Sequence, residues 1–248
     1  MFEKQERVAR VTLNRPPVNI LNIEMMDELN TVFKELHEEN INLLVIQAQG
    51  KAFCAGVDVG EHAAEKVHEM MATFHQMFNL LNSVPGISMA VVNGAALGGG
   101  CELATFCDII IASEVARFGQ PEVKVGIFAP MAAVILPYLI GRHKALEILA
   151  TGDSIDGKEA EQIGLINKCF PTEGFQDKVE EFISKIASMS APVLHLTKKA
   201  VDRGLYSSVM NAIGEIEDIY LNELMKLEDA YEGLTSFLEK RLPKWKHK

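Results

Sequence analysis

The sequence predicts an α/β fold, because short apolar strands alternate with amphipathic helices and no low-complexity stretch separates them. The chain has 248 residues, 48% of them hydrophobic and 23% charged, which is enough apolar material for one substantial core. Apolar residues alternate over 7–14 until Arg15-Pro16-Pro17 stops the pattern, and this run predicts the first strand.

The spacing of apolar residues predicts the elements that follow. Asn22 is a suitable helix cap, and the helix after it has the expected buried face Met25, Met26, Leu29, Val32, Phe33 and Leu36. A second amphipathic helix is expected over 61–82, before Pro85. Apolar runs at 43–48, 87–92 and 108–112 predict strands of a sheet that is buried on both faces.

The second half of the chain is expected to be largely helical. Helices are predicted over 144–150, 157–163, 173–188, 191–201 and 207–241, with one strand at 165–170. The last of these helices carries a stripe of Val209, Ala212, Ile213, Ile216, Ile219, Tyr220 and Leu224. No linker divides the chain before about residue 190, so we expect an α/β core over 1–190 and a helical region over 191–248.

Charge and cysteine usage exclude several classes of protein. A net charge of −10 disfavours nucleic acid and anionic membranes as partners. No targeting segment or long apolar run is visible, so we expect a soluble cytoplasmic protein. The four cysteines form no CxxC pair and are expected to be free thiols without zinc: Cys54, Cys101, Cys107 and Cys169. The seven histidines lack metal-ligand spacing and are interpreted as structural or solvated: His37, His62, His68, His75, His143, His195 and His247.

The C-terminus differs from the acidic body of the chain. Its last nine residues carry five basic side chains and no acidic one: Lys240, Arg241, Lys244, Lys246 and Lys248. This tail is either a solvated, fraying terminus or a local contact for an anion.

Three consecutive glycines, Gly98-Gly99-Gly100, lie between an expected strand and residues suited to a helix. Glycines allow a ligand to approach the backbone, and the free N–H groups of a helix start can bind phosphate or stabilise an oxyanion. The order is not G-x-G-x-x-G, which disfavours a dinucleotide site. Packing alone could explain the glycines, but Glu102 beside them would be costly to bury unless it is hydrogen-bonded or transfers protons.

A second carboxylate lies in similar surroundings. Glu122 stands among small and apolar residues at 118–126 and is either solvated or a partner that divides acid and base roles with Glu102. The tight turn at 51–58, after the strand at 43–48, can offer further backbone donors.

Together these motifs resemble the crotonase, or enoyl-CoA hydratase/isomerase, superfamily along nearly the whole chain. The matching segments are Leu13-Asn14-Arg15-Pro16, 51–58, 92–108, 118–122, Leu149-Ala150-Thr151-Gly152 and 160–165. The resemblance implies a superhelix of β-β-α repeats with a helical C-terminal oligomerisation region, assembled as trimers or as hexamers made of two trimers. It also implies that C-terminal cations lie near the phosphates of coenzyme A.

The resemblance also implies a lyase that hydrates an α,β-unsaturated acyl-CoA, with named roles in its site. The N–H groups of Val57 and Gly99 would form an oxyanion hole for the thioester carbonyl, Glu102 would activate water, and Glu122 would donate a proton. Both carboxylates are kept, as in true hydratases. No metal or redox cofactor is implied, because coenzyme A is part of the substrate. The implied substrate-binding residues are Ala55, Gly56, Asp58, Gly98, Phe128 and Pro130.

The chain departs from common short-chain hydratases over 126–137. Phe128, Pro130 and Pro137 stand where those enzymes have a Pro-Gly-x-Gly-Gly-Thr run. The segment is similar to that of the cyclohexa-1,5-dienecarbonyl-CoA hydratases of anaerobic aromatic degradation, which add water to a ring-borne dienoyl thioester. Two alternatives stay open, a general enoyl-CoA hydratase whose pocket has drifted and a Δ3,Δ2-enoyl-CoA isomerase that uses Glu122 alone. The acidic net charge disfavours an RNA-binding role.

Overall fold

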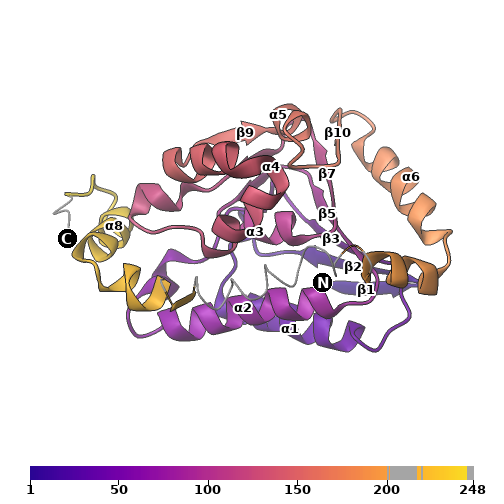
Figure 1. Ribbon diagram of the computed structural model, residues 1–248, viewed down its shortest axis with the longest axis horizontal. Helices are drawn as coiled ribbons and strands as arrows, with labels where there is room; N and C mark the ends of the chain where they lie inside the picture. Colours follow the sequence, from indigo (N-terminus) through magenta and orange to yellow (C-terminus); the bar gives the residue numbers. More distant parts are fainter. Residues whose placement is uncertain (200, 202–216, 219, 245–248) are drawn as a thin grey trace.

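The computed structural model describes residues 1–199, 201, 217–218 and 220–244 (Figure 1). Successive β-β-α repeats build the middle of the chain, and in each repeat the first strand joins a larger sheet and the second joins a smaller one. The repeats are β3 (Leu43–Ala48), β4 (Ala52–Cys54) and α2 (Val67–Ser83); β5 (Ile87–Val92), β6 (Ala95–Leu97) and α3 (Gly99–Phe106); and β7 (Ile109–Ser113), β8 (Arg117–Gly119) and α4 (Pro130–Thr151). The predicted α/β fold with β-β-α repeats is confirmed.

The larger sheet has the strand order β1-β2-β3-β5-β7-β10, in which β1 is Phe2–Gln5, β2 is Val8–Leu13 and β10 is Lys168–Phe170. All neighbours are parallel except the β1–β2 pair. Alternate residues of β3 point to opposite faces: Leu43 packs with Val179 of α6 (Phe175–Ala187), while Leu44 belongs to the main core. Figure 1 shows α6 on one side of this sheet and α3 and α4 on the other, so both faces are buried as predicted.

The smaller sheet, β4-β6-β8-β9, consists of strands of three residues each, with β9 at Ser154–Asp156. Its β4–β6 and β6–β8 pairs are parallel and β8–β9 is antiparallel. The sequence gives no sign of these strands, because three residues are too few to show alternation. Between β5 and β6 the chain requires Gly94, since a Cβ there would lie 2.0 Å from the carbonyl oxygen of Lys51.

Two helices, α1 (Ile23–Leu36) and α2, pack against each other along one side of the molecule (Figure 1). The Asn22 side chain caps α1 by accepting the N–H of Met25 at 3.2 Å. Helix α2 begins at Val67, so the prediction of a helix from residue 61 is wrong at its start. A short 3₁₀ helix, η1 (Val59–His62), comes first, because the Asp58 carboxylate caps it by accepting the N–H of Gly60 at 3.0 Å.

The largest error of the sequence prediction lies after residue 120. A 3₁₀ helix, η2 (Pro121–Val125), is followed by α4, so residues 130–137 are helical and the expected helix at 144–150 is only the last part of a longer one. Pro130 suits the first turn, where no partner is needed for a backbone N–H. Gly141, at φ 73° and ψ 155°, kinks the helix.

The C-terminal half otherwise follows the predicted order. Helix α5 (Gly157–Gln162) and α6 occupy the predicted places, β10 is shorter than the expected strand, and residues 191–199 are helical. The single helix expected over 207–241 is interrupted in the part that the structure describes, since η3 (Leu224–Lys226) and α8 (Glu228–Leu238) are separated by extended backbone at Leu227. Of its predicted stripe, Val209, Ala212, Ile213, Ile216 and Ile219 lie outside the described residues.

The described part of the basic tail folds back on α8. The Arg241 guanidinium donates to both carboxylate oxygens of Glu232, at 2.6 and 2.9 Å, and to Glu239 at 2.6 Å. Lys246 and Lys248 lie outside the described residues. Arg241 therefore neutralises acids of its own chain, and a contact of the tail with coenzyme A stays a prediction.

The four cysteines are free thiols, as predicted, and those of Cys54, Cys101 and Cys107 are buried. Within residues 1–199, 201, 217–218 and 220–244, no helix is long and apolar enough to cross a membrane. The cytoplasmic location stays a prediction.

Candidate active site

A cavity of about 390 Å³ brings together segments that are far apart in the sequence. The turn after β4, the start of α3, the connection from η2 to α4, the helix α2 and the C-terminal segment all contribute to its lining. Nine of the residues expected in the site line this cavity: Ala55, Gly56, Val57, Gly98, Gly99, Glu102, Glu122, Phe128 and Pro130.

Asp58 is the expected site residue that the cavity lining does not include. Its carboxylate caps η1 and lies 3.8 Å from the Arg15 guanidinium. Asp58 therefore shapes the turn that follows Val57.

The backbone of Val57 is held so that its N–H points away from Leu21. Val57 and Leu21 form a parallel β-bridge, in which Leu21 N–H donates to Gly56 O at 2.9 Å and Asp58 N–H donates to Leu21 O at 2.8 Å. Because N–H and C=O groups of successive extended residues point to opposite sides, the N–H of Val57 faces away from Leu21. Val57 is itself one of the residues that line the cavity.

The second backbone donor comes from the start of α3. Gly98 precedes the helix with φ 53° and ψ −131°, a conformation that favours glycine, and Gly99 is the first helical residue. The N–H of Gly99 has no partner inside its own helix. A Cβ on Gly99 would lie 2.5 Å from Val57 Cγ2, so the two residues face each other closely across the cavity.

Glu102 is a buried carboxylate on α3, with only 2% of its surface exposed. Its Oε1 accepts the N–H of Ala132 at 2.8 Å, so the side chain caps the start of α4. Burial, and then the negative charge of Glu122, raise the pKa of Glu102. The N–H groups of Ala132 and Met131 act in the opposite direction because they stabilise the ionised form.

Glu122 lies on η2 and approaches Glu102 from the other side. A Cβ on Gly98 would lie 2.5 Å from Glu122 Oε1, so glycine at 98 leaves room for this carboxylate. Glu122 Oε2 is enclosed and accepts no hydrogen bond from the described protein. Burial raises the pKa of Glu122 as well. The negative charge of Glu122 therefore disfavours a second charge on Glu102, so the pair can offer one acid and one base.

The cavity includes a histidine that the sequence reasoning missed. His62 on η1 was expected to be structural or solvated, but it lines the cavity with 8% of its surface exposed. Its Nδ1 lies 3.0 Å from the carbonyl oxygen of Asp58, which can only accept, so Nδ1 carries the hydrogen. Burial lowers the pKa of His62, and Nε2 is the ring nitrogen that the Asp58 carbonyl does not engage. A single histidine on a short turn has no periodic pattern that would reveal this position.

The remaining polar groups near the cavity do not gather as metal ligands. In the part of the chain that the structure describes, no three His, Cys, Asp or Glu side chains come close enough to hold a metal ion together. Phe74, Tyr220 and Phe237 complete the lining with aromatic surface.

Comparison with known proteins shows the family to which the chain belongs. The family described as enoyl-CoA hydratase/isomerase matches residues 3–248. A probable enoyl-CoA hydratase of Mycobacterium tuberculosis is 35% identical over 252 residues, covering 100% of this chain and 98% of the relative. A cyclohexa-1,5-dienecarbonyl-CoA hydratase of Thauera aromatica is 32% identical over 248 residues, covering 100% and 96%. An enoyl-CoA hydratase structure from Mycobacterium avium subsp. paratuberculosis superposes with a TM-score of 0.90 at 24% identity, covering 99% of this chain and 97% of that one, a likeness that shows the fold.

The chain belongs to the enoyl-CoA hydratase/isomerase family, and it is an enzyme of the enoyl-CoA hydratase type that acts on acyl-CoA. The cyclohexadienecarbonyl-CoA hydratase is one of several relatives at similar identity, so the family does not by itself define the acyl group.

Proposed function

We propose that this enzyme adds water to a compact α,β-unsaturated acyl-CoA, and that Val57 and Gly99 hold the thioester carbonyl through their backbone N–H groups. The N–H of Val57, which points away from Leu21, and the first-turn position of Gly99 in α3 support this role. They would stabilise negative charge on the carbonyl oxygen as water attacks, and each such donor is typically worth about 3 kcal/mol of barrier.

In this proposal the glutamate pair moves the protons. Ionised Glu102, whose Oε1 accepts the N–H of Ala132, takes a proton from water as the water attacks the β carbon. Glu122, whose enclosed Oε2 has no hydrogen-bond partner among the described residues, holds the proton that is delivered to the enolate-like intermediate. The pair of carboxylates, Glu102 buried and Glu122 half-buried with an enclosed Oε2, is the observation that carries the assignment to a hydratase. An isomerase of this family would need only Glu122.

The acyl group that we propose is a ring-borne dienoyl, as in cyclohexa-1,5-diene-1-carbonyl-CoA. Phe128 from the unusual 126–137 segment lines the cavity and packs edge-on against Tyr220, with ring centroids 5.4 Å apart. Pro130 also lines the cavity and fixes the start of α4. Aromatic walls of this kind suit a flat ring, and the Thauera aromatica relative carries that substrate in its name.

We further infer a homo-oligomer, a trimer or two trimers. Val193 and Leu196 on the helix at 191–199, and Met189 just before it, each expose more than half of their surface, which suits a contact between subunits. The mass of the full chain in light scattering tests this inference, and a monomer would contradict it.

The proposed activity is tested by the loss of ultraviolet absorbance of the conjugated thioester, on crotonyl-CoA and cyclohexa-1,5-diene-1-carbonyl-CoA in parallel. Mass spectrometry checks that the product has gained one water, and Glu102→Gln is the control. Hydration of the ring substrate with little turnover of crotonyl-CoA supports the proposal. Hydration of crotonyl-CoA alone would overturn the ring assignment, and hydration of neither would overturn the hydratase.

A further inference from the structure

The residues that line the cavity differ in their exposed fraction, which distinguishes the mouth of the cavity from its inner wall. Phe237 is 54% exposed and the Lys124 side chain is 52% exposed, so these residues stand at the mouth. Tyr220 lines the same cavity with 1% of its surface exposed, and Phe74 with 2%. Tyr220 and α2 therefore form part of the buried inner wall of the cavity, away from its exposed mouth at Phe237.

Tyr220 is placed beside the reacting groups. Its ring packs edge-on against Phe128 at an interplanar angle of 75°. Burial, followed by the negative charges of Glu102 and Glu122, raises the pKa of its phenol, so the ring lies within electrostatic reach of both carboxylates and keeps its hydroxyl proton. A substrate whose β carbon meets the glutamates would direct the rest of its acyl group toward this ring.

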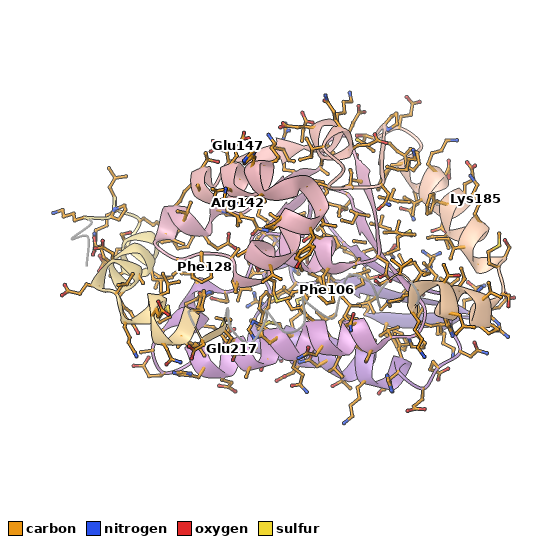
Figure 2. All side chains as sticks on the ribbon, in the orientation of Figure 1. Phe106, Phe128, Arg142, Glu147, Lys185 and Glu217 are labelled. Atoms are coloured by element: carbon orange, nitrogen blue, oxygen red, sulfur yellow. The ribbon has the colours of Figure 1, made fainter. Side chains whose placement is uncertain are left out.

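A buried polar contact holds the segment that carries Tyr220. His75 of α2 lies next to Phe74 in the sequence, and its Nδ1 donates to Glu217 Oε2 at 2.8 Å. The His75 side chain is 7% exposed and its Nε2 is enclosed without a partner among the described residues, so Glu217 supplies the ring's hydrogen bond. Figure 2 shows Glu217 beside the ribbon of α2, three positions before Tyr220.

We propose that Tyr220 is a specificity-determining residue that ends the acyl pocket, and that the His75–Glu217 pair positions it. This inference rests on the proposed function, because it defines which acyl groups the hydratase accepts. With Tyr220 in place the pocket takes short or compact cyclic acyl groups, and longer chains meet the aromatic floor.

The test compares Tyr220→Ala with the matched control Tyr220→Phe, which keeps the ring. The kcat/KM is measured on crotonyl-CoA, 2-hexenoyl-CoA, 2-octenoyl-CoA and 2-decenoyl-CoA. Tyr220→Ala is expected to shift the preference to longer chains, by about fourfold for each methylene that the freed space takes up. Tyr220→Phe should keep the wild-type profile.

The positioning role is tested with Glu217→Ala and Glu217→Gln. The glutamine amide oxygen can still accept from His75 Nδ1, so Glu217→Gln should keep the chain-length profile, whereas Glu217→Ala should relax it toward longer chains. Equal profiles for both variants would overturn the positioning role. A loss of thermal stability alone does not change a chain-length preference, so this readout separates positioning from support of the fold.

Binding of the saturated analogues butanoyl-CoA to decanoyl-CoA, measured by calorimetry, makes the test independent of turnover. A shift of binding toward longer chains in Tyr220→Ala, with no hydration of any substrate by the wild type, would support this inference and overturn the proposed function. An unchanged length profile in both readouts, or an equal shift in Tyr220→Phe, would overturn the inference. If Tyr220→Ala does not fold, the chain-length profiles of Tyr220→Leu and Glu217→Ala are measured instead, and the same outcomes support or overturn the inference.

Discussion

Replacement of Glu102 by glutamine is predicted to stabilise the protein in a pH-dependent way. Glu102 is buried, and its Oε1 bond to the Ala132 N–H can be kept by the glutamine amide oxygen. Glutamine has nearly the same shape but cannot ionise. The substitution therefore removes the burial cost of the charge and its repulsion with Glu122, while the packing is kept.

The sign and size follow from proton linkage. In the unfolded chain Glu102 ionises near its ordinary value of about 4.3, whereas the folded protein holds its pKa higher. Between these values the folded state binds more protons than the unfolded state, so the free energy of unfolding of the wild type falls as the pH rises. Each pKa unit is worth about 1.4 kcal/mol once the pH exceeds both values. A chain of this size shifts its Tm by roughly 2–4 °C per kcal/mol.

The assay is the Tm of the wild type, Glu102→Gln and a control, Glu38→Gln, from pH 4 to pH 9. Glu38 has a side chain that is 91% exposed, so its substitution should leave the curve unchanged. Glu102→Gln should match the wild type near pH 4 and exceed it by several degrees at pH 8. A variant that is less stable than the wild type at pH 8, or a difference that does not change with pH, would refute the reasoning.

Three further predictions concern the walls of the site. Gly99→Ala brings a Cβ to 2.5 Å from Val57 Cγ2 and should lower kcat about 10²-fold, because it shifts the oxyanion donors. The circular dichroism spectrum should be unchanged, and an unchanged kcat would contradict the oxyanion role. His62→Asn keeps a donor for the Asp58 carbonyl oxygen but loses Nε2, so it should lower kcat/KM by about three- to tenfold, whereas His62→Gln should keep the wild-type kcat/KM. Equal kcat/KM values for the two variants would show that Nε2 meets no ligand. Gly233→Ala places a Cβ 2.0 Å from Val125 O and should cost about 1–3 kcal/mol as α8 moves, measured as a fall in Tm; an unchanged Tm would refute this close packing.

The sequence predicts well those features whose cause is local. β3 and β5 have the predicted bounds because each is a largely apolar run, which suits a sheet that is covered on both faces. Glu102 and Glu122 stand out because a carboxylate among apolar residues is costly, and the structure brings both to one cavity.

Features that depend on distant contacts were not predicted. The strands of the smaller sheet are recognisable only by their neighbours, and α4 is hidden because Pro130, Pro137 and Gly141 resemble breakers in a window of sequence. Pro130 instead begins a helix, and the N–H of Ala132 in its first turn donates to Glu102, which lies thirty positions earlier in the chain. Tyr220 was placed on a helical stripe, but its position at the cavity floor follows from packing against Phe128.

The central claim is that Glu102 and Glu122 act together on water over the oxyanion donors. It is tested most directly by the hydration rates of Glu102→Gln, Glu122→Gln and the double variant, with the fold checked by circular dichroism. We predict that each single variant loses about 10²–10⁴-fold in kcat and that the double variant is little slower than the singles, because the two groups work as a unit. Near wild-type hydration by either single variant would contradict the claim.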